Sequence, residues 1–310
     1  MMKKFIIKSL IFIIPSYFFL LLVDIIISTY IQPAGNLHSW QELYSGEIDA
    51  DLIIFGSSRA QKSFKIKMIE DTLNIKVYNL GLINARMQIS YFRLLELLKF
   101  SKRKPKYITL EIDYFTIESI NNLNKHWQIF PYMLYNENCY KCTKDMEGYK
   151  SGYYFFPIVR YSGNFIDLIK NSFEKKPKNY YKGGYTQDTH FDKEWKEEND
   201  TVKITPEIDN KKIEYLLKFI KKCKEENIKL NFIYVPEFFF VNNKITNKEL
   251  LTKKIKLIAE QKEIPFADYS NIKNSKDTAY FYDMRHLNSK GADKFTSEYY
   301  IPWIKELYGL

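Results

Sequence analysis

The sequence predicts an α/β fold, a three-layer sandwich built on a parallel five-stranded sheet. Short apolar runs bounded by turn residues indicate buried strands, and amphipathic stretches of helical period separate them. Such alternation of strands and helices requires crossover connections, which make neighbouring strands parallel. The predicted strands are 52–55, 76–81, 106–113, 229–236 and 264–267, and the predicted helices are about 63–73, 87–100, 205–226, 247–262 and a last helix that ends near 307.

The composition is that of a globular protein. Of the 310 residues, 45% are hydrophobic and 27% are charged, which excludes an intrinsically disordered chain. The formal net charge is +10, but only six of the 47 basic residues are Arg. The Lys are scattered and often stand beside Glu or Asp, whereas a nucleic-acid binder concentrates basic residues on one element. We therefore expect no nucleic-acid partner, and we also expect no cofactor.

Residues 1–31 predict an uncleaved signal anchor, a transmembrane helix. Three lysines among the first eight residues accompany an apolar stretch, Phe5 to Ile31, that is long enough to cross a bilayer. Positive charge ahead of the span places the amino terminus in the cytoplasm, so we expect a single-pass protein of the bacterial cytoplasmic membrane with its main domain outside. A cleaved signal peptide is the alternative, although no clear small-x-small cleavage site follows. Asp24 is costly inside a span unless it reaches the interface.

The rest of the chain divides into a linker, 32–50, and an α/β domain, 51–310. The strand–helix pattern is lost at about 114–205, which is too long for a simple loop and indicates an insertion. Aromatic residues of this insertion are suited to stacking on sugar rings or, alternatively, to packing a small core of its own. They are Trp127, Tyr153, Tyr154, Tyr180, Tyr181, Tyr185 and Trp195.

The insertion also contains a CxxC pair, Cys139 and Cys142, while Cys223 stands apart. A zinc site needs two further ligands at suitable spacing, and none follows, so we expect no metal. A local disulfide in an oxidising compartment and two free thiols both remain open.

The segment DLIIFGSSRA, residues 51–60, is the first candidate for chemistry. A buried strand, a tight Gly-Ser turn and a following helix present a serine hydroxyl at the carboxyl end of a sheet in many α/β enzymes. Ser58 fills the third place of a Gly-x-Ser pattern and is the candidate nucleophile, while Ser57 shapes the turn. The alternative is a turn of small residues chosen only for its backbone angles.

A second candidate lies about 230 residues later, where Asp283 and His286 stand three apart just ahead of the last helix. A serine hydroxyl is a poor nucleophile at neutral pH until an imidazole accepts its proton and a carboxylate fixes the tautomer of that imidazole. Of the four histidines in the chain, only His286 has this setting. A surface histidine near the start of the last helix is the alternative.

Together, GSS at 56–58, NLG at 79–81 and DMRHLNSKG at 283–291 resemble the motifs of the SGNH, or GDSL-like, hydrolase superfamily. The resemblance implies a flavodoxin-like α/β sandwich over most of 50–115 and 205–310. It implies Ser58 as nucleophile, with His286 and Asp283 completing the triad. Backbone N–H groups of Ser58 and Gly81 would then form the oxyanion hole.

The sequence departs from this family where the third strand ends in Leu-Glu-Ile-Asp, residues 110–113. The family places an Asn there, whose side chain contributes to the oxyanion hole, and loss of one such donor lowers the rate about a hundredfold or more. Asn84 is a candidate replacement. Arg59 and Arg86 are further candidates and are equally suited to binding a substrate carboxylate or phosphate.

Two functions follow from these expectations. The first is a serine-dependent acyl-ester hydrolase or O-acyltransferase. The membrane-anchored form resembles branches that act on cell-envelope polymers, including alginate-acetylation and D-alanine transfer proteins, which implies an acylated envelope glycan as substrate and envelope-assembly proteins as further partners. The second is a catalytically degenerate scaffold of envelope polysaccharide assembly, which the absent Asn favours.

Overall fold

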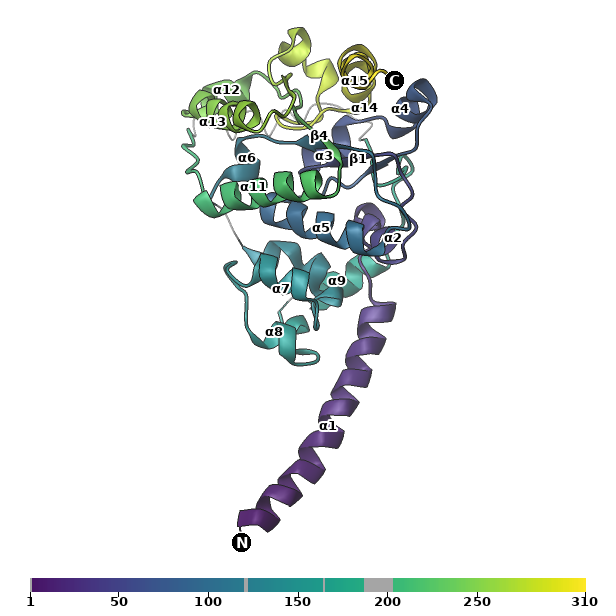
Figure 1. Ribbon diagram of the computed structural model, residues 1–310, viewed down its shortest axis with the longest axis vertical. Coiled ribbons are helices and arrows are strands. Elements are labelled where there is room, and N and C mark those ends of the chain that lie inside the picture. The colour runs from purple at the N-terminus through teal and green to yellow at the C-terminus, as the bar shows by residue number, and fades with distance from the viewer. Residues whose placement is uncertain (1, 120–121, 164, 187–202) are drawn as a thin grey trace. The chain divides into compact units, whose positions relative to one another are not determined.

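The structure, a computed structural model, describes residues 2–119, 122–163, 165–186 and 203–310 (Figure 1). The chain forms two compact units. The helical unit consists of Met1–Leu37 and Asn121–Lys175, and the sheet unit consists of His38–Ile120 and Lys176–Leu310.

The sheet unit contains a five-stranded sheet with the order β2-β1-β3-β4-β5, and every neighbouring pair is parallel. The predicted three-layer α/β fold is therefore confirmed. The strands are β1 (Leu52–Phe55), β2 (Val77–Asn79), β3 (Tyr107–Glu111), β4 (Lys229–Tyr234) and β5 (Phe266–Asp268). The strand order reverses at β1, so the carboxyl ends of β1 and β3 lie at the point where open α/β sheets form their binding crevice.

Helices cover both faces of this sheet (Figure 1). On one face α5 (Met87–Phe100) packs against α11 (Asn210–Glu225). On the other face α4 (Ile66–Leu73) packs against α15 (Ile301–Tyr308), and α14 (Ser289–Phe295) packs against α3 (Ser58–Ser63). Further α-helices in the described part of the sheet unit are α2 (Ser39–Tyr44), α6 (Tyr114–Ile117), α12 (Phe240–Lys244) and α13 (Lys248–Gln261).

The helix predicted at about 63–73 is present as α4, but it begins only at Ile66, and a separate helix that was not predicted, α3, precedes Phe64 and Lys65. Phe64 is extended (φ −116°, ψ 129°), and its ring packs against Phe295 and Tyr300. The Lys65 N–H donates to the Thr296 hydroxyl at 3.0 Å. Burial of the Phe64 ring beneath the last helices therefore interrupts the helix, and Ser58 becomes the first residue of α3.

The start of α11 also differs from the prediction. The Thr-Pro-Glu signal at 205–207 predicts a helix there, but α11 begins at Asn210. Its N-cap is Asp209, whose carboxylate accepts the Lys211 N–H at 2.8 Å. An Asp cap supplies the acceptor that an N-terminal helical N–H lacks.

The predicted insertion at about 114–205 is divided between the two units. Residues 121–175 belong to the helical unit, whereas α6 and residues 176–186 belong to the sheet unit. Trp195, predicted to stack on a sugar or to pack the insertion, lies outside the described residues. Short helices make up the described part of the insertion in the helical unit: α7 (Glu137–Thr143), α8 (Gly152–Phe155), α9 (Phe165–Ser172) and the 3₁₀ segment Leu123–Tyr132.

All three cysteines are buried, and none of them forms a disulfide. Cys139 and Cys142 lie on α7, where their side chains belong to the core of the helical unit. Cys223 lies on α11, and burial raises the pKa of its thiol to about 12. Buried, protonated thiols of this kind are inert.

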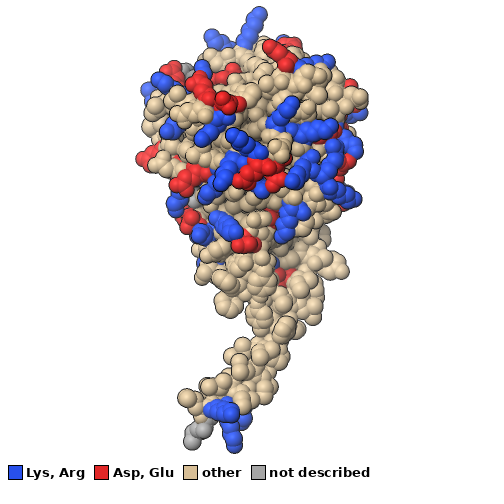
Figure 2. Space-filling view, viewed as in Figure 1, with Lys and Arg blue, Asp and Glu red and all other residues tan. Residues whose placement is uncertain are grey.

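The helical unit begins with α1 (Met2–Tyr30), a helix long and apolar enough to cross a membrane. In the space-filling view, uncharged side chains cover α1 between its free end, where basic side chains gather, and the rest of the unit (Figure 2). The same view shows blue and red side chains intermixed over the sheet unit, as the scattered lysines of the sequence predict.

Candidate active site

The structure brings Ser58, His286 and Asp283 together. The Ser58 hydroxyl lies 2.8 Å from Nε2 of His286, and Nδ1 of the same ring lies 2.8 Å from Oδ2 of Asp283. Ser58 is the first residue of α3, shortly after β1, whereas Asp283 and His286 lie in the loop before α14. Ser58 and His286 are 228 residues apart in the sequence. A chain of hydroxyl, imidazole and carboxylate at these distances is the arrangement that activates a serine.

The turn that presents Ser58 depends on Gly56. Its φ is +145°, and a Cβ there would lie 2.7 Å from the side chain of Glu111 and 2.8 Å from Cβ of Ala60. Ser57 then caps α3: its hydroxyl accepts the Arg59 N–H at 3.2 Å and donates to Oε2 of Glu111 at 3.0 Å. Close packing against Glu111 on β3 thus requires the small residues Gly56 and Ser57 of this turn.

The loop that carries His286 is held by its own polar side chains. Oδ1 of Asp283 accepts the backbone N–H groups of Arg285 and His286 at 2.7 and 2.9 Å. Asn288 caps α14 by accepting the Gly291 N–H at 2.9 Å, and its amide donates to the carbonyl oxygens of Ala279 and Phe281. Asp283 and Asn288 therefore fix the backbone on both sides of His286.

The electrostatics favour the protonation states that a serine mechanism needs. Burial lowers the pKa of His286 below its ordinary value of 6.5, Asp283 opposes that shift, and Lys62 adds to it. Burial raises the pKa of Asp283, but the hydrogen bond and charge of His286 outweigh burial, so the net shift is downward from 3.8. At neutral pH the imidazole is therefore an available base beside an ionised carboxylate.

The predicted oxyanion donors differ in their hydrogen bonding and exposure. Among the described residues no acceptor is recorded for the backbone N–H of Ser58, as expected of the first residue of a helix. The N–H of Gly81, in contrast, donates to Oδ1 of Asn79 at 2.8 Å. Asn84 lies at the exposed tip of the turn before α5, with a left-handed backbone (φ 60°).

Gly81 has a packing role that explains its place in the NLG motif. A Cβ on Gly81 would collide with the backbone nitrogen of Gln61 in α3. The Asn79 amide donates to the Ala60 carbonyl oxygen at 2.8 Å. The segment after β2 therefore lies directly against α3, and Asn79 joins the two.

Arg59 and Arg86 have partners other than the predicted substrate anion. Arg59 is buried and pairs with Asp113 at 2.6 Å and with Glu237 at 3.1 Å. Arg86 pairs with Glu118 and lies over the Phe115 ring. Both guanidinium groups are thus paired with carboxylates of the sheet unit, and their roles in substrate binding and in the oxyanion hole stay predictions.

Two further residues of the site were not predicted from the sequence. Glu111, at the end of β3, is fully buried beneath the Ser57 turn, and burial followed by the charge of Asp113 raises its pKa to about 8. Lys62 stands one turn after Ser58 on α3, and its ammonium lies 5.7 Å from the ring centroids of Tyr185 and Tyr282. The i, i+4 spacing from Ser58 was the available clue to Lys62, because it places both side chains on one helix face.

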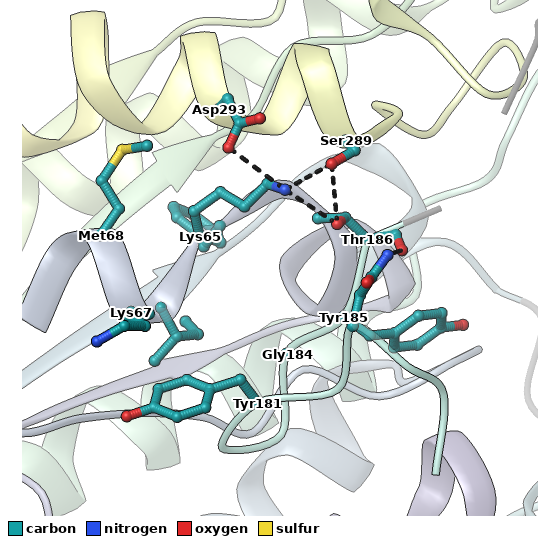
Figure 3. A pocket seen from close by; sticks show the side chains of 12 residues that line it. Lys65, Lys67, Met68, Tyr181, Gly184, Tyr185, Thr186, Ser289 and Asp293 are labelled. Atoms are coloured by element: carbon teal, nitrogen blue, oxygen red, sulfur yellow. Dashed lines mark hydrogen bonds and ion pairs between the residues drawn. The ribbon is translucent and has the colours of Figure 1, made fainter. Parts of the chain in front are cut away.

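A pocket of about 340 Å³ lies beside this site (Figure 3). Its lining, taken from described residues, includes neither Ser58 nor His286, but it includes Ser289, the first residue of α14, and Tyr185, whose ring contacts Lys62. Lys65 reaches across it to Thr186, Ser289 and Asp293 at 3.2, 2.6 and 3.3 Å. Tyr181 also lines the pocket and is 39% exposed, so one aromatic face is available to a ligand.

The other aromatic residues suggested for sugar stacking are placed differently. The Tyr180 hydroxyl donates to Glu42 at 2.6 Å, and Tyr153 is buried within the helical unit against Phe130. Within the described part of the chain, no group of three or more His, Cys, Asp or Glu side chains is arranged to hold a metal ion.

No protein-family model and no curated protein matches the chain. Solved structures that resemble it include a GDSL-like lipase from Bacteroides thetaiotaomicron, with 11% identity over 88% of this chain and 97% of the other and a TM-score of 0.41. A psychrotrophic esterase from Pseudoalteromonas sp. has 12% identity over 83% of this chain and 98% of the other and a TM-score of 0.44. Because the sequence identities and TM-scores of both pairs are low, these similarities carry no argument about function. The functional assignment therefore rests on the residues of the site.

Proposed function

We propose that the protein is a serine-dependent acyl-ester hydrolase or O-acyltransferase. The observation that carries the proposal is the continuous hydrogen-bonded chain from the Ser58 hydroxyl through His286 to Asp283, with both contacts at 2.8 Å. The alternative for His286, a surface residue near the start of a helix, does not account for its contacts on both ring nitrogens.

In the proposed reaction the Ser58 oxygen attacks the carbonyl carbon of an acyl ester while Nε2 of His286 accepts the serine proton. Asp283 orients the ring and stabilises the imidazolium that forms. The tetrahedral intermediate collapses, the bond to the alcohol oxygen breaks, and the imidazolium returns its proton to the departing alcohol. Water then releases the acyl group as an acid in a hydrolase, or a sugar hydroxyl accepts it in a transferase, with His286 again serving as base.

The negative charge of the intermediate requires donors. The backbone N–H of Ser58 is suited to this role, because no described residue accepts it. The N–H of Gly81 serves the same role only after release from Asn79. We therefore propose a weak oxyanion hole in the free protein, completed when substrate displaces the Asn79 side chain.

We further propose an acylated glycan of the cell envelope as substrate. The pocket beside the triad supports this choice, since it combines the half-exposed Tyr181 ring with hydroxyl groups of Thr186 and Ser289. Aromatic faces and hydroxyl groups are suited to the apolar and polar faces of a sugar ring. The α1 helix would keep such an enzyme at the membrane surface.

A catalytically degenerate scaffold is the second candidate. The engaged N–H of Gly81 favours it, as does the presence of Glu111 and Asp113 where the family carries an Asn. A fluorophosphonate probe separates the two functions, because it labels an activated serine whatever the natural substrate.

The experiment uses the full chain in detergent. We expect the probe to label Ser58, as located by peptide mapping, and we expect Ser58→Ala to lose both labelling and turnover of p-nitrophenyl acetate. Ser297→Ala, an exposed serine on the same unit, is the matched control and should retain both. Equal labelling of wild type and Ser58→Ala would refute the serine mechanism. Labelling at Ser58 without turnover of any acetylated sugar would leave the mechanism and remove the proposed substrate.

A further inference from the structure

The helical unit contains a polar contact in a place where a polar group is costly. Asp24 on α1 is 1% exposed, and its two carboxylate oxygens pair with the two terminal nitrogens of Arg160, each at 2.6 Å. Oδ2 also accepts the backbone N–H of Ile158 at 2.6 Å. A bidentate pair with further hydrogen bonds is the geometry that makes a buried charge tolerable.

These bonds define the docking loop, residues 155–160, which runs alongside α1. Ile158 holds a left-handed backbone (φ 69°), an uncommon conformation for a β-branched residue. The hydrogen bond from its N–H to Asp24 offsets that strain. One turn further along α1, the Ser28 hydroxyl lies 2.7 Å from the Tyr161 hydroxyl. The loop is therefore shaped by α1, and α1 is part of the folded helical unit.

Contacts also extend towards the amino terminus of α1. The Tyr17 hydroxyl donates to the Phe155 carbonyl oxygen at 3.3 Å and contacts the Tyr135 hydroxyl. Tyr17 precedes Asp24 by seven residues, which is about 10 Å along a helix axis. The docking loop thus follows α1 for about 10 Å beyond the Asp24 ion pair, into the apolar part of the helix.

The side chains that this loop turns outward are apolar. Phe155, Phe156 and Val159 are 51%, 57% and 40% exposed. Phe18, Phe19 and Leu22 of α1, the helix that this loop contacts, are also exposed. In water, such a patch on a monomer marks an interaction surface.

The length of α1 fixes the depth of this patch. Residues 5–23 are 19 residues in which Lys8, near the start, is the one charged side chain, and they span about 28 Å of helix, close to the ~30 Å of a bilayer core. With Phe5 at one edge of the core, Asp24 falls at the other edge and Tyr17 about 10 Å inside it. The loop that contacts Tyr17 is therefore at the depth of lipid acyl chains.

We infer that the docking loop inserts Phe155 and Phe156 into the bilayer beside α1, on the side of the membrane where the rest of the helical unit lies. The occupant of the patch is the lipid of the membrane that α1 spans. The Asp24–Arg160 pair then lies at the membrane interface, and two elements, α1 and the docking loop, anchor the helical unit in the membrane. This inference is independent of the chemistry at Ser58.

Depth-dependent quenching tests the inference on the full chain in vesicles of phosphatidylcholine and phosphatidylglycerol. A nitrobenzoxadiazole label is placed at Phe156→Cys and, as the matched control, at Phe173→Cys. Phe173 is 82% exposed, but it adjoins Asn171 and Glu174, which contact Ala34 and Gly35 beyond the end of α1. Wild type treated in the same way corrects for the buried native thiols.

We expect the Phe156→Cys label to lose most of its fluorescence to doxyl groups on lipid acyl chains and little to iodide in the water. The Phe173→Cys label should show the reverse. Equal quenching of both labels by iodide, or equal quenching of both by lipid, would overturn the placement. A Val159→Cys label repeats the test at a second exposed position if the Phe156 variant does not fold.

Discussion

Arg59 and Asp113 form a buried ion pair next to the candidate nucleophile, with 2.6 Å between Nη1 and Oδ2. Glu237 accepts a further bond from Arg59 and also pairs with Lys248. The two cations are Arg59 and Lys248, and the three carboxyl groups near them are those of Asp113, Glu237 and Glu111. The charges of this cluster therefore cancel when Glu111 carries a proton. The raised pKa of Glu111 agrees with that balance.

The first prediction concerns Arg59. Arg59→Gln leaves Asp113 and Glu237 buried with less positive charge, so we expect the free energy of unfolding to fall by about 3–5 kcal/mol, measured by chemical denaturation. Arg103→Gln is the control, because Arg103 forms a more exposed pair with Asp51 and should cost about 1 kcal/mol or less. An unchanged stability with a raised KM would instead support the predicted substrate role of Arg59.

The second prediction concerns the acid limb of the pH–rate profile. His286 must be neutral to accept a proton, so kcat/KM should fall as the pH drops through its lowered pKa. The charge of Lys62 contributes to that lowering, so Lys62→Met should raise the pKa of His286 and move the acid limb to higher pH. Lys67→Met removes an exposed lysine paired with Asp71 and should leave the limb in place. A limb that does not move in Lys62→Met would exclude electrostatic coupling of the two groups.

The fold was predictable because its signals are local. Buried parallel strands are continuous apolar runs, and β1 and β4 begin where the sequence predicts. The approach of Ser58 to His286 followed from topology, since residues after parallel strands gather at one sheet edge.

The features that the sequence did not reveal depend on distant partners or on short elements. Arg59 is 54 residues from Asp113 and 178 from Glu237, and no local pattern encodes such pairs. The break at Phe64 arises from aromatic packing against Phe295 and Tyr300. The helices of the insertion, such as the four residues of α8, are too short to show a helical period.

The third prediction concerns Glu111 and the pH dependence of stability. Its pKa in the folded protein is about 8 against an ordinary 4.5. Between these values the folded state holds a proton that the unfolded state has lost, so this group lowers stability as the pH rises from about 4.5 to 8. Glu111→Gln cannot titrate, so its melting temperature relative to wild type should increase steadily from pH 5 to pH 8.5. A difference that is constant with pH would mean that Glu111 stays ionised in the folded protein.

The fourth prediction concerns the pair of Asp24 and Arg160, which are 136 residues apart in sequence. Arg160 is 1% exposed, so Asp24→Asn leaves a buried guanidinium without its counter-charge and should lower the melting temperature in detergent. Arg160→Gln should do the same by leaving the carboxylate unpaired. The double variant removes both charges, so its loss should be smaller than the sum of the two single losses. Additive losses would show that the two groups do not interact, and α1 would then be free to act as a leader that is removed without cost to the helical unit.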